Sequence, residues 1–219
     1  MDWSLMSMLP SQIWESLYMT IGSALVAYLI GLPLGVILVV TDKDGIRPKR
    51  VLNQVLGIIV NLFRSVPFLI LMIALSGFTR LIAGKAYGSP AAIIPLIIGS
   101  APFVARMVES SLKEVDPGVV EAAQAMGAST WQIISKVILP EAKPSLIVGA
   151  AISITTILGY SATAGAVGAG GLGAWAINYG YYRYNAAVMW VAVALLVLIV
   201  QVFQAVGMWL AKVLDRRLH

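Results

Sequence analysis

A series of long apolar segments constrains this chain more than any other feature. A helix needs about 20 predominantly apolar residues to cross a lipid bilayer. Five segments reach or approach this length, at approximately residues 17–40, 51–78, 91–108, 145–167 and 186–211. Hydrophobic residues make up 59% of the sequence and charged residues only 11%, which is typical of a membrane protein. We therefore expect an all-α polytopic membrane protein with five transmembrane helices in one domain, residues 1–219.

The second apolar segment is the least regular, because Arg64 falls within it and Pro67 interrupts it. Either this span is long and bent, or residues 51–63 lie on the membrane surface and the crossing begins near Ser65. A charged side chain in the middle of a bilayer is costly, which favours the second arrangement. We expect Arg64 and Arg106 to extend towards lipid phosphates.

Lysine and arginine residues are distributed unevenly among the connections. The residues before the first span contain none, the loop after it contains four, residues 106–143 contain four, and the tail at 212–219 contains three. The two remaining connections contain two and one. Positive residues accumulate on the cytoplasmic side, so we expect the N-terminus outside and the C-terminus inside. The first apolar run does not resemble a cleavable signal peptide.

The longest polar connection, at about residues 109–144, is expected to form two short helices on the cytoplasmic side. Asp116 can cap a helix that begins at Pro117, where the missing N–H costs nothing. Gly127 is well placed to end this helix in a left-handed turn. A small helix of this kind can enter a groove on a partner protein, and the alternative is that it lies on the lipid surface.

The second helix of this loop has its own boundary signals. Ser129 and Gln132 have the spacing of a capping box, and Pro140 and Pro144 mark the expected end of the helix. A glycine hinge would then join the two short helices.

Several motifs suggest catalysis or nucleotide binding but lack the required context. Residues 168–173 match G-x-G-x-x-G, yet no βαβ unit surrounds them, so these glycines more plausibly permit tight helix packing or a re-entrant turn. Gly159-Tyr160-Ser161 resembles the Gly-x-Ser of intramembrane serine proteases, but a catalytic serine needs a base to take its proton. The one histidine of the chain, His219, lies at the far end of the sequence. We expect no catalytic residue, metal site or cofactor, and no nucleic acid among the partners.

The chain also lacks an evident energy source. It contains no Walker A sequence, no cysteine, and no buried acidic residue in the expected spans that could relay protons. If transport is driven, its energy has to come from another protein. A loop shaped to contact a partner is consistent with this expectation.

Hydroxyl side chains mark the outer end of the fourth segment. Tyr160, Ser161 and Thr163 precede the glycine-rich stretch, and we expect them at or near a substrate path and its outer gate. Tyr160 and Thr163 share one helical face, whereas Ser161 lies about 100° away. The alternative role of these hydroxyls is hydrogen bonding between helices.

The polar loop resembles the EAA motif of bacterial ABC-importer permeases. Glu121-Ala122-Ala123, Gly127 and residues 137–140 fit E-A-A-x3-G-x9-I-x-L-P, with Val137 in place of the usual isoleucine. Three further segments extend the likeness, at residues 61–68, 101–109 and 159–173. The chain is similar to the methionine-type ABC importer permeases, the MetI family.

This resemblance implies the type I importer permease fold, a homodimer in the bacterial inner membrane, and two cytoplasmic ATP-binding subunits. It also implies an extracytoplasmic methionine-binding lipoprotein and a translocation path for L- and D-methionine and related derivatives. ATPase coupling would fall to the motif residues Glu121, Ala122, Ala123, Gly127, Leu139 and Pro140. The alternatives are a permease of the same fold for another amino acid or small polar solute, and a channel or scaffold subunit.

Overall fold

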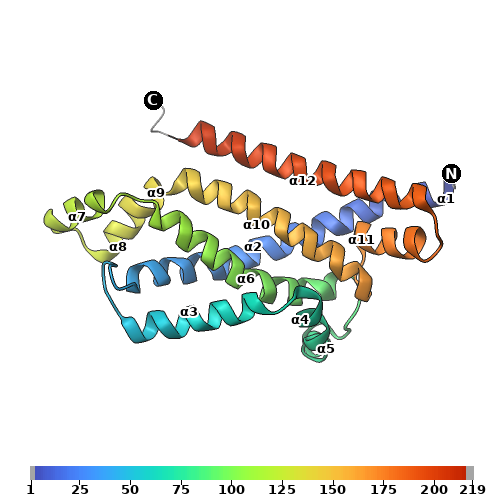
Figure 1. The fold of residues 1–219 in the computed structure, drawn as a ribbon, viewed down its shortest axis with the longest axis horizontal. Coiled ribbons are helices and arrows are strands. Elements are labelled where there is room, and N and C mark those ends of the chain that lie inside the picture. Colours follow the sequence, from blue (N-terminus) through green and yellow to red (C-terminus); the bar gives the residue numbers. More distant parts are fainter. Residues whose placement is uncertain (1–2, 216–219) are drawn as a thin grey trace. The chain divides into compact units, whose positions relative to one another are not determined.

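The computed structural model describes residues 3–215, and these residues are mostly helical and contain no strand (Figure 1). Met1, Asp2 and residues 216–219, which include Arg216, Arg217 and His219, lie outside the described residues. The α-helices are α1 (Trp3–Met6), α2 (Leu9–Thr41), α3 (Arg50–Ser65), α4 (Phe68–Ala74), α5 (Ser76–Ala83), α6 (Ser89–Lys113), α7 (Pro117–Ala125), α8 (Thr130–Ile133), α9 (Leu139–Glu141), α10 (Lys143–Ala164), α11 (Gly171–Trp175) and α12 (Ala186–Leu214). The π-helices η1 (Ile134–Ile138) and η3 (Ala176–Tyr181) and the 3-10 helix η2 (Gly165–Val167) complete the series. The all-α expectation is confirmed.

Within residues 3–215, four helices are long and apolar enough to cross a membrane. They are α2, α6, α10 with η2, and α12, and the count becomes five if α3 and α4 are taken as one broken span. The helices extend beyond the expected segments, because α2 begins at Leu9 and α6 continues to Lys113. The expectation of five spans therefore agrees with the structure when the broken pair is counted as one.

The second apolar segment forms two helices separated by a bend. Residues 50–65 form one continuous helix, α3, and the chain bends by 97° between α3 and α4. Helices α4 and α5 have 7 and 8 residues, fewer than the about 20 that one helix needs to cross a bilayer. The expectation that the crossing begins near Ser65 stays a prediction. The break at Pro67 is confirmed, because this residue is the N-cap of α4. Arg64 lies in the last turn of α3, just before the bend.

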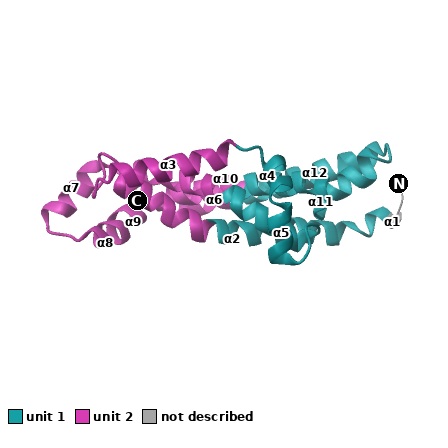
Figure 2. Cartoon of the chain, turned by 90° about the horizontal axis from the view of Figure 1, so that it is seen from below, with its two compact units in different colours: residues 1–27, 66–100, 154–203 teal, residues 28–65, 101–153, 204–219 magenta. Residues whose placement is uncertain are grey.

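The described chain divides into two compact units (Figure 2). Among the described residues, one comprises 3–27, 66–100 and 154–203, and the other comprises 28–65, 101–153 and 204–215. The boundaries fall inside α2, α6, α10 and α12. The expectation of one transmembrane domain over residues 1–219 stays a prediction.

Each unit has its own buried apolar cluster. In the first unit, Met19, Leu96 and Ile157 are fully buried and belong to a cluster that brings together α2, α4, α6 and α10. In the second unit, Leu38, Val60 and Ala105 join α2, α3 and α6. Helix α12 instead exposes most of its apolar side chains, as expected of a surface in contact with lipid.

Glycines allow α2 and α6 to approach closely within the second unit. A Cβ atom on Gly31 would lie 2.6 Å from Val104, and one on Gly35 would lie 2.7 Å from the Ala105 carbonyl oxygen and from Val108. Small residues are typical of such helix contacts in membranes. These two glycines therefore set the separation of the two helices.

We expect Gly35→Val to destabilise the protein by about 1–3 kcal/mol, because the added side chain overpacks this contact. Thermal unfolding of the purified protein in detergent measures the effect. Gly77→Ala is the matched control, since nothing lies within 4 Å of the added methyl group and alanine is the better helix former. Equal melting temperatures for the two variants would show that the α2–α6 contact does not set stability.

Arg106 does not extend to lipid phosphates as expected. Its guanidinium pairs with Glu109 and donates hydrogen bonds to the Gly57 carbonyl oxygen at 3.1 Å and to Asn61 Oδ1 at 2.9 Å. The expectation was wrong because it considered α6 alone, whereas α3 and the following turn of α6 supply acceptors. The arginine thus ties α6 to α3.

Glu109 also corrects the expectation that no span contains a buried acidic residue. Its side chain is buried within α6, but it is paired with Arg106 and Lys113. Lys113 in turn lies 2.8 Å from Asp42, just after α2, and this hydrogen bond lowers the pKa of Asp42 below its ordinary value. The acidic residue is therefore part of an ion-pair network that connects α2 and α6.

Candidate functional site

The first helix of the polar loop begins as its sequence predicts. Helix α7 starts at Pro117, and Asp116 Oδ1 accepts a hydrogen bond from the Gly118 N–H at 2.8 Å. The aspartate thereby satisfies one of the backbone donors that every helix start leaves unpaired. The predicted cap is confirmed.

Gly127 ends α7 in a left-handed turn, as predicted. Its φ angle is +78°, and no atom lies within 4 Å of the position a Cβ would take. The Ala128 N–H donates to the Ala123 carbonyl at 3.1 Å and the Gly127 N–H to the Gln124 carbonyl at 2.9 Å, which is the pattern of a Schellman motif. Glycine is therefore favoured here by backbone conformation and not by lack of space.

The second helix of the loop begins and ends as predicted, but it contains a wide turn. The capping box is present, with the Ser129 N–H donating to Gln132 Oε1 at 2.8 Å and Ser129 Oγ accepting from the Gln132 N–H at 3.3 Å. The helix then widens into η1 and continues through Pro140 to Glu141. The helix ends at Glu141, between Pro140 and Pro144, as predicted. The wide turn before Pro140, closed by a Leu139 N–H bond to the Ile134 carbonyl, relieves the clash that proline causes in a regular helix.

The loop presents both polar and apolar side chains on its surface. Glu121 and Ala122 are exposed, whereas Ala123 is buried. The apolar side chains of Met126 and Trp131 are 81% and 72% exposed, although they lie outside the membrane-spanning helices. Such exposed apolar surface in a polar loop is typical of a contact with another protein.

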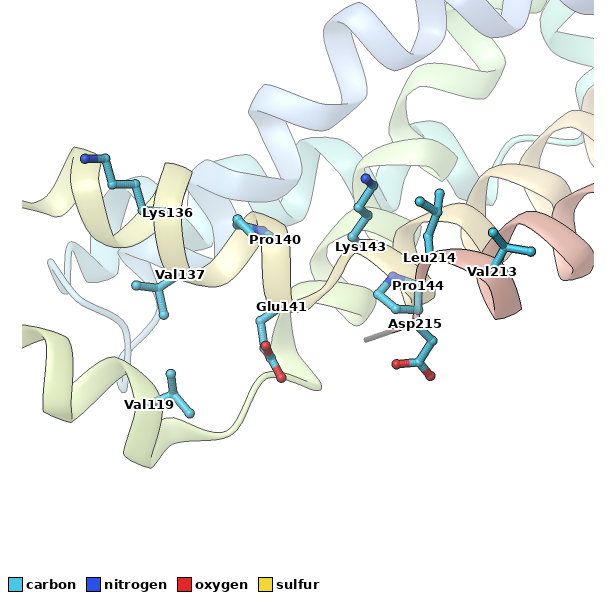
Figure 3. Close-up of a pocket in the computed structure, with 10 residues that line it drawn as sticks. All are labelled: Val119, Lys136, Val137, Pro140, Glu141, Lys143, Pro144, Val213, Leu214 and Asp215. Atoms are coloured by element: carbon cyan, nitrogen blue, oxygen red, sulfur yellow. The ribbon is translucent and has the colours of Figure 1, made fainter. Parts of the chain in front are cut away.

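Figure 3 shows a pocket beside the C-terminal part of the motif. Val119 of α7, Val137, Pro140 and Pro144 contribute apolar surface, and residues at the end of α12 also line it. The carboxyl groups of Glu141 and Asp215 lie along one side of this pocket in the view. Of the two last motif residues, Pro140 is exposed and Leu139 is half-buried.

The three hydroxyl residues at the outer end of α10 have different surroundings. The Tyr160 ring stacks on Phe68 of α4, with centroids 4.6 Å apart and an angle of 7° between the planes. Ser161 is buried, donates to the Leu158 carbonyl at 2.8 Å, and has its Oγ 3.4 Å from Thr20 Oγ1 of α2. Ser161 therefore matches the alternative role of bonding between helices.

Thr163 is the exposed member of the group. Its Oγ1 donates to the carbonyl oxygen of Gly159 at 3.0 Å, so the hydroxyl bonds to the helix itself. Gly159 is also exposed, with nothing within 4 Å of a Cβ at that position. Thr163 and Gly159 thus form an open part of the α10 surface.

The glycine-rich segment packs tightly against the end of α10. A Cβ on Gly173 would overlap the backbone of Ala162, and one on Gly165 would overlap the backbone of Ala174. Glycine at both positions lets α10 and α11 meet backbone to backbone, so the expected tight packing is confirmed.

Sequence reasoning missed the residues that hold this segment in place. Glu15 of α2 accepts hydrogen bonds from Ser89 Oγ at 2.6 Å and from the Gly171 N–H at 3.0 Å. Ser16 Oγ accepts from the Leu172 N–H at 2.8 Å. The sequence did contain one signal for these contacts, because Gly170 has no side chain that could cap α11. The first backbone N–H groups of α11 therefore need acceptors from another part of the chain.

Comparison with known proteins gives consistent results. The family described as "Binding-protein-dependent transport system inner membrane component" matches residues 31–219. The probable D-methionine transport system permease protein MetI of Vibrio cholerae is 50% identical over 204 residues, which cover 93% of this chain and 91% of that protein. The methionine import system permease protein MetP of Bacillus subtilis is 46% identical over 181 residues, covering 83% and 82%.

Solved structures agree with this likeness. A chain of the MetNI methionine ABC transporter in an inward-facing conformation superposes with a TM-score of 0.97 at 46% identity. The match covers 99% of this chain and 100% of that chain. This chain therefore has the type I ABC importer permease fold and belongs to the family of binding-protein-dependent transport system inner membrane components.

Proposed function

We propose that this chain forms the translocation path for methionine in an ATP-driven importer, and that it accepts L- and D-methionine and related derivatives. The observation that carries the proposal is the match to methionine permeases over almost the whole chain, with 50% identity to the Vibrio cholerae protein. The Bacillus subtilis relative is likewise a methionine import permease. As a permease subunit, the chain has a transport role and not a catalytic one.

The proposed assembly contains two copies of the chain, two cytoplasmic ATP-binding subunits and an extracytoplasmic methionine-binding lipoprotein. The described part of the chain offers up to five spans, which enclose little volume by themselves, and this favours a path between two copies. A closed pair related by a twofold axis is the commonest arrangement of identical subunits. The exposed surface at Gly159 and Thr163 offers small side chains for a close approach between the two copies.

Coupling to ATP hydrolysis is assigned to the polar loop. Helix α7 presents Glu121 and Ala122 to the surface while the buried Ala123 packs it onto the rest of the loop. Gly127 sets the turn after α7, and Leu139 and Pro140 connect the loop to α10. Closure of the ATPase pair would move α7 as a rigid body and thereby shift the spans between two packings.

The outer gate is assigned to the end of α10. Thr163 is the strongest candidate, because it is short, partly polar and exposed. Tyr160 would shape the path through its stacked ring, and Ser161 would hold α10 against α2.

Uptake by the reconstituted transporter tests this proposal. We expect methionine uptake that requires ATP and is inhibited by an excess of unlabelled L- or D-methionine. Inhibition by a different amino acid alone would indicate another substrate, and flux without ATP would indicate a channel. The proposal stands only if both the requirement for ATP and the competition by methionine are observed.

The coupling assignment predicts that Glu121→Lys weakens association with the ATPase subunits, because it reverses a charge at the contact. We expect at least a tenfold loss of affinity, which corresponds to about 1.4 kcal/mol. Co-purification and titration of the ATPase subunit measure the effect. Glu114→Lys, the same charge reversal at an exposed residue before α7, is the control, and equal affinities for the two variants would contradict the assignment.

The proposed orientation places α7 in the cytoplasm and the start of α2 outside. Because the chain lacks cysteine, single cysteines report directly on sidedness. We expect Gln124→Cys to resist an impermeant thiol reagent in intact cells and to react in inverted vesicles. Ser11→Cys should behave in the opposite way, and labelling of position 124 from outside would reverse the topology.

A further inference from the structure

Two neighbouring side chains of α2 hold the start of α11. Glu15 Oε2 accepts hydrogen bonds from the Gly171 N–H at 3.0 Å and from Ser89 Oγ at 2.6 Å, while Ser16 Oγ accepts from the Leu172 N–H at 2.8 Å. We call this arrangement the Glu15–Ser16 clamp. It joins α2, the first residue of α6 and the start of α11 through side chains that the proposed coupling loop and path do not use.

The clamp replaces a local helix cap. The first N–H groups of a helix have no acceptor within the helix, and the N-cap residue of α11, Gly170, has no side chain to supply one. A Cβ on Gly170 would overlap the Glu15 carboxyl group, and Gly171 has a φ of +82°. The glycines therefore admit Glu15 to a position that a residue with a side chain would block.

Helix α11, which the clamp holds, packs against the part of α10 that contains Thr163. Helix α11 meets the end of α10 backbone to backbone, at the contacts of Gly173 with Ala162 and of Gly165 with Ala174. Thr163 lies within this stretch of α10. Since the two backbones leave no space to slide, the position of α11 determines the position of Thr163, and discrete packing of this kind transmits displacement.

Helix α2 also contacts α10 directly, through the 3.4 Å approach of Thr20 Oγ1 to Ser161 Oγ. Met19, one position earlier, is fully buried in the cluster that contains Ile157 and Ala164 of α10. Helix α2 therefore contacts the α10–α11 turn at several positions, and of the contacts made by Glu15, Met19 and Thr20, that of Glu15 lies nearest to the N-terminal end of α2.

We propose that Glu15 is a positioning residue of the outer gate, whose carboxyl group sets where α11, and Thr163 with it, lies against α2. The inference rests on the proposed gate at Thr163. Loss of the carboxyl group leaves the Gly171 N–H and the Ser89 hydroxyl without their acceptor, so the turn becomes free to adopt other positions. Glutamine retains a side-chain oxygen that can accept from both donors, and it should preserve most of the positioning.

The test uses Thr163→Cys in the assembled transporter with its ATPase subunits, in proteoliposomes without nucleotide. The rate of reaction with an impermeant thiol reagent then reports the exposure of position 163. We expect Glu15→Ala to change this rate by about tenfold. Loss of one strong hydrogen bond shifts the ratio of two positions of the turn by about this factor. We expect Glu15→Gln to change it less than threefold, and Ser11→Ala, an exposed serine one turn earlier on α2, to leave it unchanged.

The Ser89→Ala variant makes the test independent of whether Glu15→Ala assembles. It removes one of the two donors to Glu15, so it should shift the labelling rate in the same direction. Combined with Glu15→Ala, it should add less than its separate effect, because both changes remove the same hydrogen bond. The proposal would be overturned if Ser89→Ala and Glu15→Ala gave the same labelling rate as Ser11→Ala. It would also be overturned if the effects of Ser89→Ala and Glu15→Ala on the labelling rate were simply additive in the double variant.

Failure of the proposed function would give a different result. If the unmodified transporter assembles but takes up no methionine, the substrate assignment is wrong. The labelling comparison still decides the role of Glu15, because it is made without substrate.

Discussion

Replacing Thr163 by tryptophan is expected to abolish methionine uptake while the ATPase subunits remain bound. Thr163 is exposed on α10, so the indole ring can be accommodated without displacing the core of its own subunit. In the proposed dimer it would project into the path instead. We expect uptake to fall at least a hundredfold in proteoliposomes and co-purification of the ATPase subunit to be unchanged, since position 163 is remote in sequence from the loop at 117–139.

Val197→Trp is the matched control for this substitution. Val197 lies on α12 and is 53% exposed among other apolar side chains, where an added ring should contact lipid. Its uptake should match that of the unmodified protein. Normal uptake by Thr163→Trp, or loss of assembly in that variant alone, would exclude position 163 as the gate.

Gly127→Val is expected to separate ATP hydrolysis from transport. Gly127 has a φ of +78°, which costs a residue with a Cβ about 1–2 kcal/mol, and valine is among the residues least suited to it. Because no atom crowds this position, the strain falls on the backbone of the turn that follows α7. The strained turn changes the direction of α7 relative to the next helix. We expect uptake to fall at least tenfold while ATP hydrolysis per assembled transporter persists.

Gly127→Asn distinguishes backbone strain from the loss of glycine itself. Asparagine adopts left-handed conformations several-fold more readily than other residues with a side chain, so this variant should retain most of the uptake. Both variants are compared by the ratio of substrate transported to ATP hydrolysed. An equal ratio for Gly127→Val and the unmodified protein would contradict the coupling role of this turn.

The local structure of the polar loop could be predicted because it depends on neighbouring residues. The Asp116 cap, the start at Pro117, the left-handed Gly127 and the Ser129–Gln132 capping box each involve residues within a few positions of one another. Backbone donors at helix ends and the steric freedom of glycine dictate these features. The same holds for the long apolar spans, whose lengths follow from the thickness of the bilayer.

Predictions that treated a helix in isolation were less successful. Arg106 was expected to extend to lipid, but its partners Gly57 and Asn61 come from α3, about 50 positions earlier. The cost of a charged residue in a membrane depends on which side chains reach it, and the sequence does not state these contacts.

The helical class, the apolar spans, the caps of the polar loop and the motif that resembles an importer permease all follow from residue patterns. The packing of distant segments was needed to show that Ser161 bonds towards α2, that Thr163 remains exposed and that Glu15 supplies the missing cap of α11. The physical reason is the separation along the chain. Glu15 and Gly171 are 156 positions apart, and their hydrogen bond exists only because packing of the helices brings an acceptor to a helix start that has none of its own.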